Sequence, residues 1–449
     1  MRRVPSLLWV RRDLRRRDNP ALNAAAGDGP VLPLFVLDPL LWNASGDVRR
    51  AWLLRSLRAL DTSFDGALVV RTGDPRTVVP EVAAEVGAGR VHVAADFAPY
   101  GAARDDEVAS RLADDGRDLV RTGSPYAVAP GRVRKGDGTA YRVYTPFFKA
   151  WLAHGWRATA PDVDVAWVEG VRSEALPEEP VLAAALTEVG EEAALARWDS
   201  FRADGLAAYD DQRNRPDVDG TSMLSAHLRW GEIHPRTLLA DLDDSPAHTV
   251  FRKEIAWREF YADVLHHAPA SARGWLDPRF AQMEYDDGPE ADARFEAWCA
   301  GRTGYPFVDA GMRQLLAEGW MHNRVRMVVA SFLVKDLHLP WQRGARWFMR
   351  MLRDADLASN QHGWQWTAGC GTDAAPYFRV FNPVTQGLRF DPSGDYVRRY
   401  VPELRELPGA AAHEPWDHPL LAVDYPARVV DHAAERDESL RRYAALPPR

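Results

Sequence analysis

Cysteine is scarce in this sequence. Cys299 and Cys370 are the only two among 449 residues, and neither has the CxxC spacing of a metal or redox site. Two isolated thiols give no disulfide framework of the kind found in small secreted proteins. We therefore expect a reduced, cytoplasmic protein.

Long apolar runs are also missing. No run of about 18 apolar residues occurs, so we expect no membrane-spanning helix. The N-terminus, 1–5, has a short charged start without the long apolar region and small-residue cleavage site of a signal peptide. No GxGxxG motif is present, so a nicotinamide-binding function has no support.

Net positive charge is another absence. The 56 Lys and Arg residues are outnumbered by 64 Asp and Glu, which gives a formal net charge of −8. This excludes a protein that coats nucleic acid by overall basic charge. An arginine-rich face can still bind DNA locally, because salt screens charges beyond roughly 10 Å.

Tryptophan, in contrast, is abundant. The chain has 17 Trp against 13 Tyr and 16 Phe, so some of these rings are expected to do more than pack. Trp364 and Trp366 follow Asp354 and Asp356 in a polar stretch that runs on to residue 383. Large flat rings beside carboxylates and amides suit a planar, polar, aromatic ligand.

Residues 1–122 alternate short apolar runs with helical patterns. This alternation predicts a Rossmann-like α/β domain, with a parallel sheet covered by helices on both faces. The expected strands are 7–10, 31–37, 67–70, 91–94 and 118–120, and the expected helices are 21–26, 48–60, 77–86 and 102–112.

The arginine-rich segment 11–17 follows the first expected strand. It stands at the carboxyl end of that strand, where ligands bind in parallel sheets. A solvated loop and an anion- or cofactor-binding loop are both open for it.

The alternation stops after residue 122. Residues 123–190 are rich in Pro, Gly and Ala, with weak periodicity apart from an aromatic segment at 144–151, which indicates a long connector packed on the surface. Residues 191–449 carry helical patterns and predict an all-α domain. At 449 residues, more than one domain is the expected organisation. The expected helices are 193–209, 250–266, 291–300, 307–318, 325–335 and 344–352.

Two of these helices carry similar polar and aromatic faces. Both have the i, i+3, i+4 spacing that places three side chains on one side of a helix: Glu254, Trp257 and Arg258, then Asn323, Arg326 and Met327. Each face alone is also typical of a helix with a surface ion pair and a half-buried ring. Together with the tryptophan-rich stretch, they favour a ligand site.

Seven long segments carry a family pattern: WVRRDLRRRDNPAL, VLPLFVLDP, YRVYTPFFKAW, DGTSMLSAHLRWGEIHPR, EIAWREFYADVLHHAP, GRTGYPFVDAGMRQLLAEGWMHNRVRMVVASFLVKDLHLPW and DADLASNQHGWQWTAGCGTDAAPYFRVFNPVTQG. In these segments and in their order, the chain resembles the DNA photolyase/cryptochrome family over nearly its whole length. The resemblance implies an α/β domain, a connector and a helical domain that holds FAD in a folded form.

The resemblance also implies which residues bind FAD. The matching positions are Tyr209, Thr221, Ser222, Leu224 and Ser225 near the phosphates, then Arg258, Arg326, Asp354, Asp356 and Asn360. Arg326 is expected to pair with Asp354, and Asp356 to face the edge of the flavin ring. Asn360 is expected nearest the flavin N5, where an amide suits a fully reduced anionic flavin and an aspartate could protonate the ring.

The substrate implied is DNA that contains cyclobutane pyrimidine dimers, as for class I photolyases. The dimer would be flipped out between Trp257 and Trp366, with Glu254 and Asn323 bonded to the pyrimidine edges. Met327 completes the class I pattern. The positions expected to contact DNA phosphates are Arg213 and Arg324. The reaction implied is carbon–carbon bond cleavage, driven by an electron that passes from the photoexcited flavin to the dimer and returns.

Photoreduction in the family uses three tryptophans. Trp364 and Trp341 match the first two, but no tryptophan stands where the third is expected, about ten residues before Trp298. Tyr285 is the candidate replacement, and we expect slower or altered photoreduction. An antenna chromophore, a deazaflavin in preference to a folate, is expected in the α/β domain.

A cryptochrome-like blue-light photoreceptor without repair activity is the alternative function. Asn360, the Trp257 and Trp366 pair, and Asn323 with Met327 argue against it. We expect a monomer without a metal site.

Overall fold

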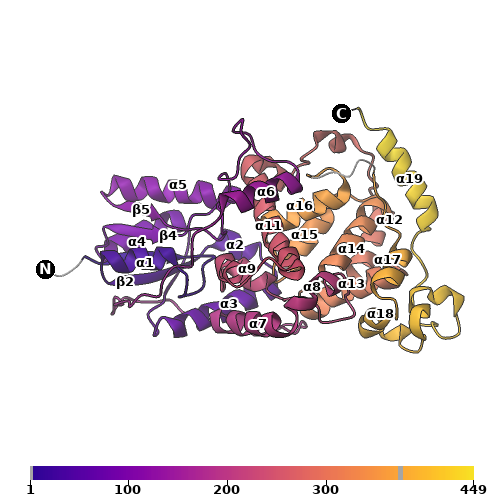
Figure 1. The fold of residues 1–449 in the computed structure, drawn as a ribbon, viewed down its shortest axis with the longest axis horizontal. Helices are drawn as coiled ribbons and strands as arrows, with labels where there is room; N and C mark the ends of the chain where they lie inside the picture. The colour runs from indigo at the N-terminus through magenta and orange to yellow at the C-terminus, as the bar shows by residue number, and fades with distance from the viewer. Residues whose placement is uncertain (1–3, 373–377, 449) are drawn as a thin grey trace.

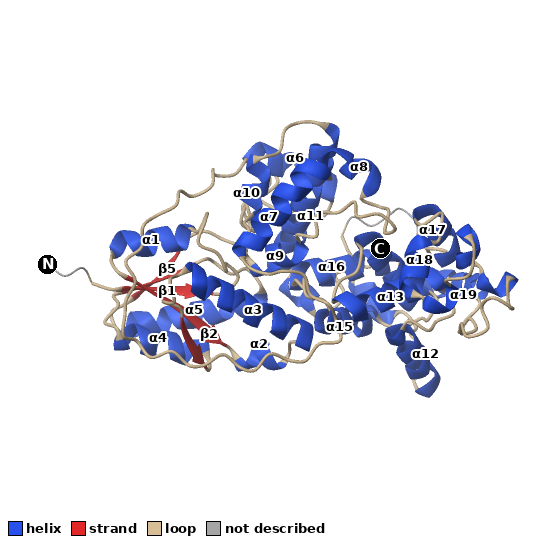
Figure 2. Cartoon of the chain, turned by 90° about the horizontal axis from the view of Figure 1, so that it is seen from below, coloured by secondary structure: helices blue, strands red, loops and turns tan. Residues whose placement is uncertain are grey.

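The computed structural model describes residues 4–372 and 378–448. Residues 373–377, within the tryptophan-rich stretch, lie outside the described part. The α/β domain forms one end of the molecule and the helical domain the other, with the two joined along a broad contact (Figures 1 and 2).

A five-stranded parallel sheet of order β3-β2-β1-β4-β5 forms the α/β domain. The strands are β1 (Ser6–Val10), β2 (Val31–Leu37), β3 (Val69–Thr72), β4 (Arg90–Val93) and β5 (Asp118–Arg121). The helices are α1 (Pro20–Asp28), α2 (Pro39–Asn43), α3 (Asp47–Ser63), α4 (Pro75–Glu85) and α5 (Pro99–Asp114). The predicted fold class of this domain is confirmed.

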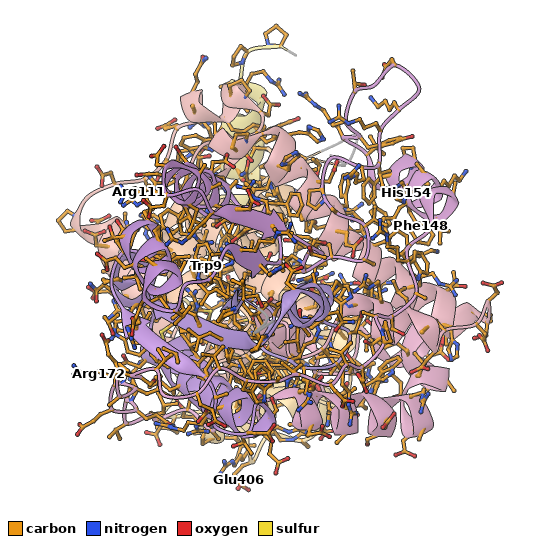
Figure 3. The ribbon with its side chains drawn as sticks, turned by 90° about the vertical axis from the view of Figure 1, so that its left-hand side faces the viewer. Trp9, Arg111, Phe148, His154, Arg172 and Glu406 are labelled. Carbon is orange, nitrogen blue, oxygen red and sulfur yellow. The ribbon has the colours of Figure 1, made fainter. Side chains whose placement is uncertain are left out.

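Both faces of the sheet are buried. Leu8 and Val10 of β1 pack with α1 and α3, whereas Leu7 and Trp9 point to the opposite face and pack with α4 and α5. This alternation follows from the two-residue period of a strand. Seen from the sheet end, Trp9 lies near the centre of the molecule (Figure 3).

The chain between the two domains packs along both of them. It contains helix α6 (Tyr144–His154), which covers the aromatic segment seen in the sequence. Trp167 forms an isolated parallel bridge with Val31 of β2. Farther on, the amide of Ala185 donates to the carbonyl of Ala317 in the helical domain.

The C-terminal part is helical throughout. Its α-helices are α7 (Glu191–Asp204), α8 (Tyr209–Gln212), α9 (Ser225–Trp230), α10 (Pro235–Ala240), α11 (Pro246–His267), α12 (Pro289–Ala300), α13 (Pro306–Glu318), α14 (Asn323–Lys335), α15 (Trp341–Met351), α16 (Leu357–Ala368), α17 (Pro383–Phe390), α18 (Asp395–Tyr400) and α19 (His432–Ala444). Short 3-10 turns are η1 (Leu206–Ala208), η2 (Pro269–Ala272), η3 (Pro278–Gln282), η4 (Pro402–Leu404), η5 (Gly409–His413) and η6 (Pro415–Asp417). The predicted all-α domain is confirmed.

The continuous helix expected over 193–209 is wrong. Helix α7 ends at Asp204, and the chain passes through Gly205 and η1 before α8 begins at Tyr209. A Cβ on Gly205 would lie 2.7 Å from the Phe201 ring, so this close approach needs glycine. The break brings the Tyr209 ring edge-on to Phe251, with ring centroids 5.2 Å apart.

Helix α16 lies at the centre of the helical domain and packs against α11, α14 and α15. Trp364 on α16 fits against α15 because residue 344 is a glycine: a Cβ there would lie 2.1 Å from the Trp364 ring. None of the helices in the described residues is both long and apolar enough to cross a membrane.

Candidate functional site

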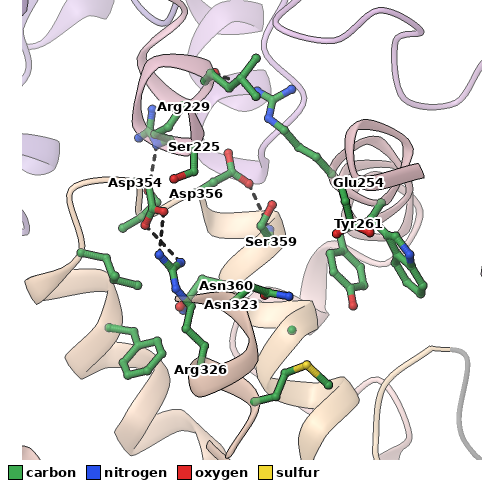
Figure 4. Close-up of a pocket in the computed structure, with 18 of the residues that line it drawn as sticks. Ser225, Arg229, Glu254, Tyr261, Asn323, Arg326, Asp354, Asp356, Ser359 and Asn360 are labelled. Atoms are coloured by element: carbon green, nitrogen blue, oxygen red, sulfur yellow. Dashed lines mark hydrogen bonds and ion pairs between the residues drawn. The ribbon is translucent and has the colours of Figure 1, made fainter. Parts of the chain in front are cut away.

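A cavity of about 510 Å³ lies among helices α9, α11, α14 and α16 (Figure 4). The side chains that line it come from segments more than a hundred residues apart. They include most of the site residues predicted from the sequence. The expected residues that line it are Tyr209, Arg213, Ser222, Ser225, Glu254, Trp257, Arg258, Asn323, Arg324, Arg326, Met327, Asp354, Asp356, Asn360, Trp364 and Trp366. Thr221, Leu224, Trp341 and Tyr285 do not line it.

Arg326 and Asp354 form the expected pair on one wall. The two guanidinium nitrogens of Arg326 donate to the two carboxylate oxygens of Asp354, at 3.2 and 2.7 Å. The arginine Nε donates to the carbonyl of Met321 at 2.7 Å, which fixes the plane of the guanidinium. A planar fork held in this way presents a fixed positive charge to the cavity.

Asp356 caps the first turn of α16. One carboxylate oxygen accepts from the amide of Ser359 at 3.0 Å, and the other accepts from Nη2 of Arg12 at 2.6 Å. Burial opposes ionisation of this carboxyl, but the charges of Arg12, Arg258 and Arg229 outweigh it and hold the pKa of Asp356 below its ordinary value.

The contact with Arg12 settles the question left open for the segment 11–17. The solvated-loop interpretation is wrong for most of this segment, because its side chains bond to other parts of the chain. Arg11 pairs with Asp105, and Arg15 donates to the carbonyl of Gly231 at 3.0 Å. Arg12 alone reaches a residue of the cavity wall, through Asp356.

Positive charge exceeds negative charge around the cavity. The described residues of its lining include five arginines, at 213, 229, 258, 324 and 326, against the three carboxylates of Glu254, Asp354 and Asp356. Nη1 of Arg229 is buried and has no hydrogen-bond partner in the part of the chain that the structure describes. Burial, together with the nearby charges of Arg12 and Arg49, lowers the pKa of Arg229. An arginine cluster short of anionic partners fits a ligand that carries negative charge, such as the diphosphate of FAD.

Asn360 has a fixed amide orientation. Its Nδ2 donates to the carbonyl of Ala345 at 3.1 Å and to Oε1 of Gln361 at 2.8 Å. The side chain lines the cavity, so its oxygen is the atom left to accept a hydrogen bond from a ligand.

The aromatic and amide groups expected to hold a base lie on the same cavity. Trp257 and Trp366 are both half-buried, Met327 is half-buried, and Asn323 is exposed. Glu254 forms an ion pair with Arg213, with 2.7 Å between Oε1 and Nη1.

A second cavity of about 600 Å³ shares Arg324 and Met327 with the first. Among the residues that the structure describes, its lining includes Arg379 and Arg389 and contains no carboxylate. Arg324 is held there by Asn214, whose Oδ1 accepts from Nη2 at 2.7 Å. A basic cavity that opens beside the first suits the phosphates of a nucleic-acid strand.

Trp364 is buried with 3% of its surface exposed, and its Nε1 has no hydrogen-bond partner within residues 4–372 and 378–448. Its ring contacts Phe348 and Trp298, with centroids 5.1 and 6.1 Å away. Trp341 is fully buried. Tyr285 packs against Trp275, whose Nε1 donates to the tyrosine hydroxyl at 3.4 Å. The electron-transfer role of Tyr285 stays a prediction.

Several cavity residues were missed by the sequence analysis. Arg229, Tyr261 and Ser359 line the cavity, and Arg12 supports it from the α/β domain. Arg229 lies inside one of the segments that carry the family pattern. A basic residue close to Ser225 was the one sequence feature that could have marked it as a cavity residue. Arg12 was visible only as part of an arginine-rich run, because nothing local links it to Asp356, 344 positions away.

Comparison with known proteins agrees with this arrangement. Family models described as "DNA photolyase" and "FAD binding domain of DNA photolyase" match residues 6–164 and 251–445. A deoxyribodipyrimidine photo-lyase of Streptomyces griseus is 43% identical, covering 94% of this chain and 96% of that protein.

Two solved structures are similar over almost the whole chain. A bacterial class III photolyase from Agrobacterium tumefaciens superposes with a TM-score of 0.90, at 37% identity, covering 99% of this chain and 98% of the other. A cryptochrome from Synechocystis has a TM-score of 0.88 at 27% identity, covering 98% of this chain and 100% of the other. With the family models, the full-length relative and the cavity in agreement, the chain belongs to the DNA photolyase/cryptochrome family.

Proposed function

We propose that this protein is a light-driven DNA-repair enzyme, a deoxyribodipyrimidine photo-lyase that splits cyclobutane pyrimidine dimers. The observation that carries the proposal is a single cavity that combines two ligand environments. One part is rich in arginine and fits an anionic cofactor. The other part presents Trp257 and Trp366 with Asn323 and Met327, which suit a pair of flat pyrimidines.

The arginine-rich part is where FAD binds in this proposal. Nη1 of Arg229, which has no hydrogen-bond partner among the described residues, and the hydroxyls of Ser222 and Ser225 would bind the diphosphate region. Arg326, held by Asp354, would offset negative charge on a reduced flavin, and the oxygen of Asn360 would be free to accept a hydrogen bond from it. When bound in its reduced form, FAD supplies the photoexcited electron that the repair reaction needs.

The protein groups at the other part bind and orient DNA. A dimer cannot reach the cavity inside a duplex, so it must be extruded, and its weakened stacking lowers that cost. Trp257 and Trp366 then provide stacking surfaces worth roughly 1–3 kcal/mol per base. Glu254 would have to exchange its ion pair with Arg213 for the pyrimidine edge, which frees Arg213 for a DNA phosphate.

Two finer assignments belong to the proposal. Asn323 and Met327 favour a class I photolyase, although the similar solved structure from Agrobacterium tumefaciens is described as class III. An antenna chromophore, a deazaflavin or a folate, would be held by the α/β domain. We further propose that the domains divide at 1–122, 123–190 and 191–449, and that the protein acts as a monomer.

The test is direct repair. The purified protein is examined by absorption for bound flavin and antenna bands, reduced, and illuminated with oligonucleotides that contain either a cyclobutane dimer or a (6-4) photoproduct. We expect light-dependent restoration of the cyclobutane substrate and no reaction with the (6-4) substrate. A flavin-loaded, photoreducible protein that repairs neither substrate would contradict the proposal and favour the photoreceptor function.

A further inference from the structure

Helix α6 lies behind one wall of the cavity. Tyr144, its first residue, stacks on Trp257 of α11, with ring centroids 3.7 Å apart and 8° between the ring planes. Trp257 lines the cavity and Tyr144 does not. The tyrosine therefore covers the face of the indole that is turned away from the cavity.

Tyr144 is itself held firmly. Its hydroxyl donates to the carbonyl of Lys253 at 2.7 Å, and this is the carbonyl to which an α-helix assigns the amide of Trp257. Phe148, one turn farther along α6, stacks on the tyrosine with ring centroids 5.9 Å apart and 20° between planes. Phe260 meets it edge-on at 5.8 Å. Only 7% of Tyr144 is exposed.

These contacts form a series of nearly parallel rings that runs from Phe148 through Tyr144 to Trp257 and ends at the cavity. The series starts in the connector, on the side of the molecule where α6 projects (Figure 3). A half-buried tryptophan without such support would lose rotamer freedom when a base stacks on it, and that loss would weaken binding.

We propose that Tyr144 is a positioning residue for substrate recognition, which fixes the plane of Trp257 as a stacking surface for the extruded pyrimidine dimer. The inference rests on the proposed function and deepens it. It assigns a role in lesion recognition to the connector, because Tyr144 belongs to α6 and acts through Trp257. Because undamaged duplex DNA is bound mainly through its phosphates, Tyr144 contributes to selectivity for damage and not to general DNA affinity.

The first experiment compares dissociation constants of the flavin-loaded protein for dimer-containing DNA and for the same undamaged sequence. Tyr144→Leu is expected to weaken binding of damaged DNA roughly three- to tenfold, the usual contribution of an aromatic pair. Binding of undamaged DNA, the flavin content and the repair rate at saturating DNA should stay near the parent values. Tyr144→Phe keeps the ring and should restore most of the damaged-DNA affinity.

Phe148→Leu is the matched control, since it removes a ring from the same series one layer farther from the cavity. Its effect on damaged-DNA affinity should be smaller than that of Tyr144→Leu. Equal losses in the two variants, or a Tyr144→Leu protein that loses flavin and both DNA affinities together, would show a merely structural role and overturn the proposal. Unchanged affinity for damaged DNA in Tyr144→Leu would overturn it as well.

The second experiment does not depend on repair or on DNA. The protein is labelled with 5-fluorotryptophan, and the fluorine NMR signal of residue 257 is assigned with Trp257→Phe. We expect Tyr144→Leu to shift and broaden that signal, because the ring current and the restraint are lost, and Tyr144→Phe to leave it near its parent position. If the parent protein binds no dimer but Tyr144→Leu shifts and broadens the residue 257 signal, only the proposed function is contradicted. If Tyr144→Leu leaves that signal unchanged, the stacking inference itself is contradicted.

Discussion

At the scale of single residues, Asn360 has an amide whose orientation is fixed on both sides. Both of its amide hydrogens point at acceptors, the carbonyl of Ala345 and the side-chain oxygen of Gln361. The amide therefore cannot flip without losing two hydrogen bonds. This arrangement offers a ligand an acceptor and never a proton, which matches a cofactor that works as a reduced anion.

Replacing Asn360 with Asp tests this chemistry. A carboxylate at this position would face two acceptor oxygens, so the new carboxyl should take up a proton and its pKa should rise. We expect Asn360→Asp to lower the repair yield and to make the absorption spectrum of the reduced flavin change between pH 5 and 9.

Asn360→Ser is the control, since a serine hydroxyl adds no group that titrates in this range. If the spectra of the parent, Asn360→Ser and Asn360→Asp proteins were equally insensitive to pH, the proposed position of this side chain beside the flavin ring would be wrong.

Residue spacing was enough to predict which side chains share a helix face, but not which partners those faces meet. The face of Glu254, Trp257 and Arg258 was predicted correctly because helical spacing is local. Its tertiary contacts, Arg213 for Glu254 and Tyr144 for Trp257, depend on how α8 and α6 pack on α11. No short-range pattern encodes that packing.

At the scale of helices, α11 lines the cavity and also anchors the connector. Glu259 is 2% exposed and accepts from Nε1 of Trp151 at 2.6 Å and from the amide of Val128 at 3.0 Å. The amide of Ala127 donates to its other oxygen. One buried carboxyl thus fixes α6 and the start of the connector on α11, next to the Tyr144 and Trp257 pair.

Glu259 should give the protein a measurable pH dependence. Burial raises the pKa of Glu259 to about 7 against an ordinary value of 4.5, although Trp151 and the amides of Val128 and Ala127 oppose the shift. Between these values the folded chain keeps a proton that the unfolded chain has released. The contribution of this group to stability therefore falls as pH rises from about 4.5 to 7, by at most about 3 kcal/mol.

Glu259→Gln removes this titration and leaves one acceptor oxygen for three N–H donors, so its amide group faces at least one of them. We expect a lower melting temperature at every pH, with the deficit relative to the parent larger at pH 5 than at pH 8, followed by thermal unfolding. Glu188→Gln, at an exposed position of the connector, is the control and should show neither effect. A deficit independent of pH would mean that Glu259 ionises at its ordinary pKa in the folded protein.

At the scale of the whole molecule, the loop after β1 joins the two domains. The amide of Leu14 donates to the carbonyl of Trp230, and a Cβ on Gly231 would lie 1.9 Å from the carbonyl of Arg12. Gly231 also has φ of +70°, so this close approach requires glycine. The two domains were predicted from their patterns, but this joint was not, because it pairs residues over 200 positions apart.

The ion pair between Arg12 and Asp356 crosses that joint and reaches the cavity wall. Removing one member of a buried pair leaves an uncompensated charge, which commonly costs about 3–5 kcal/mol. Arg229 and Arg258 stay near Asp356, so the cost here should be smaller. We expect Arg12→Gln to lower the melting temperature and to weaken retention of FAD during gel filtration, because Asp356 caps the helix that carries Asn360 and Trp364.

The pH dependence of this deficit has a definite sign. In the parent, Asp356 has a lowered pKa, so its stabilising contribution is complete above its unfolded value of 3.8 and is lost only as pH falls through the folded value. Without Arg12 the buried carboxyl has a higher pKa and takes up a proton as the solution is acidified. The deficit of Arg12→Gln should therefore be largest near pH 8 and shrink toward pH 4.

Two controls separate this effect from general loss of charge. Arg12→Lys keeps the positive charge and should recover part of the FAD retention. Arg17→Gln removes an arginine from the same loop that is exposed and pairs with the exposed Glu192, so it should change little. Equal behaviour of Arg12→Gln and Arg17→Gln would show that the joint does not support the cofactor cavity.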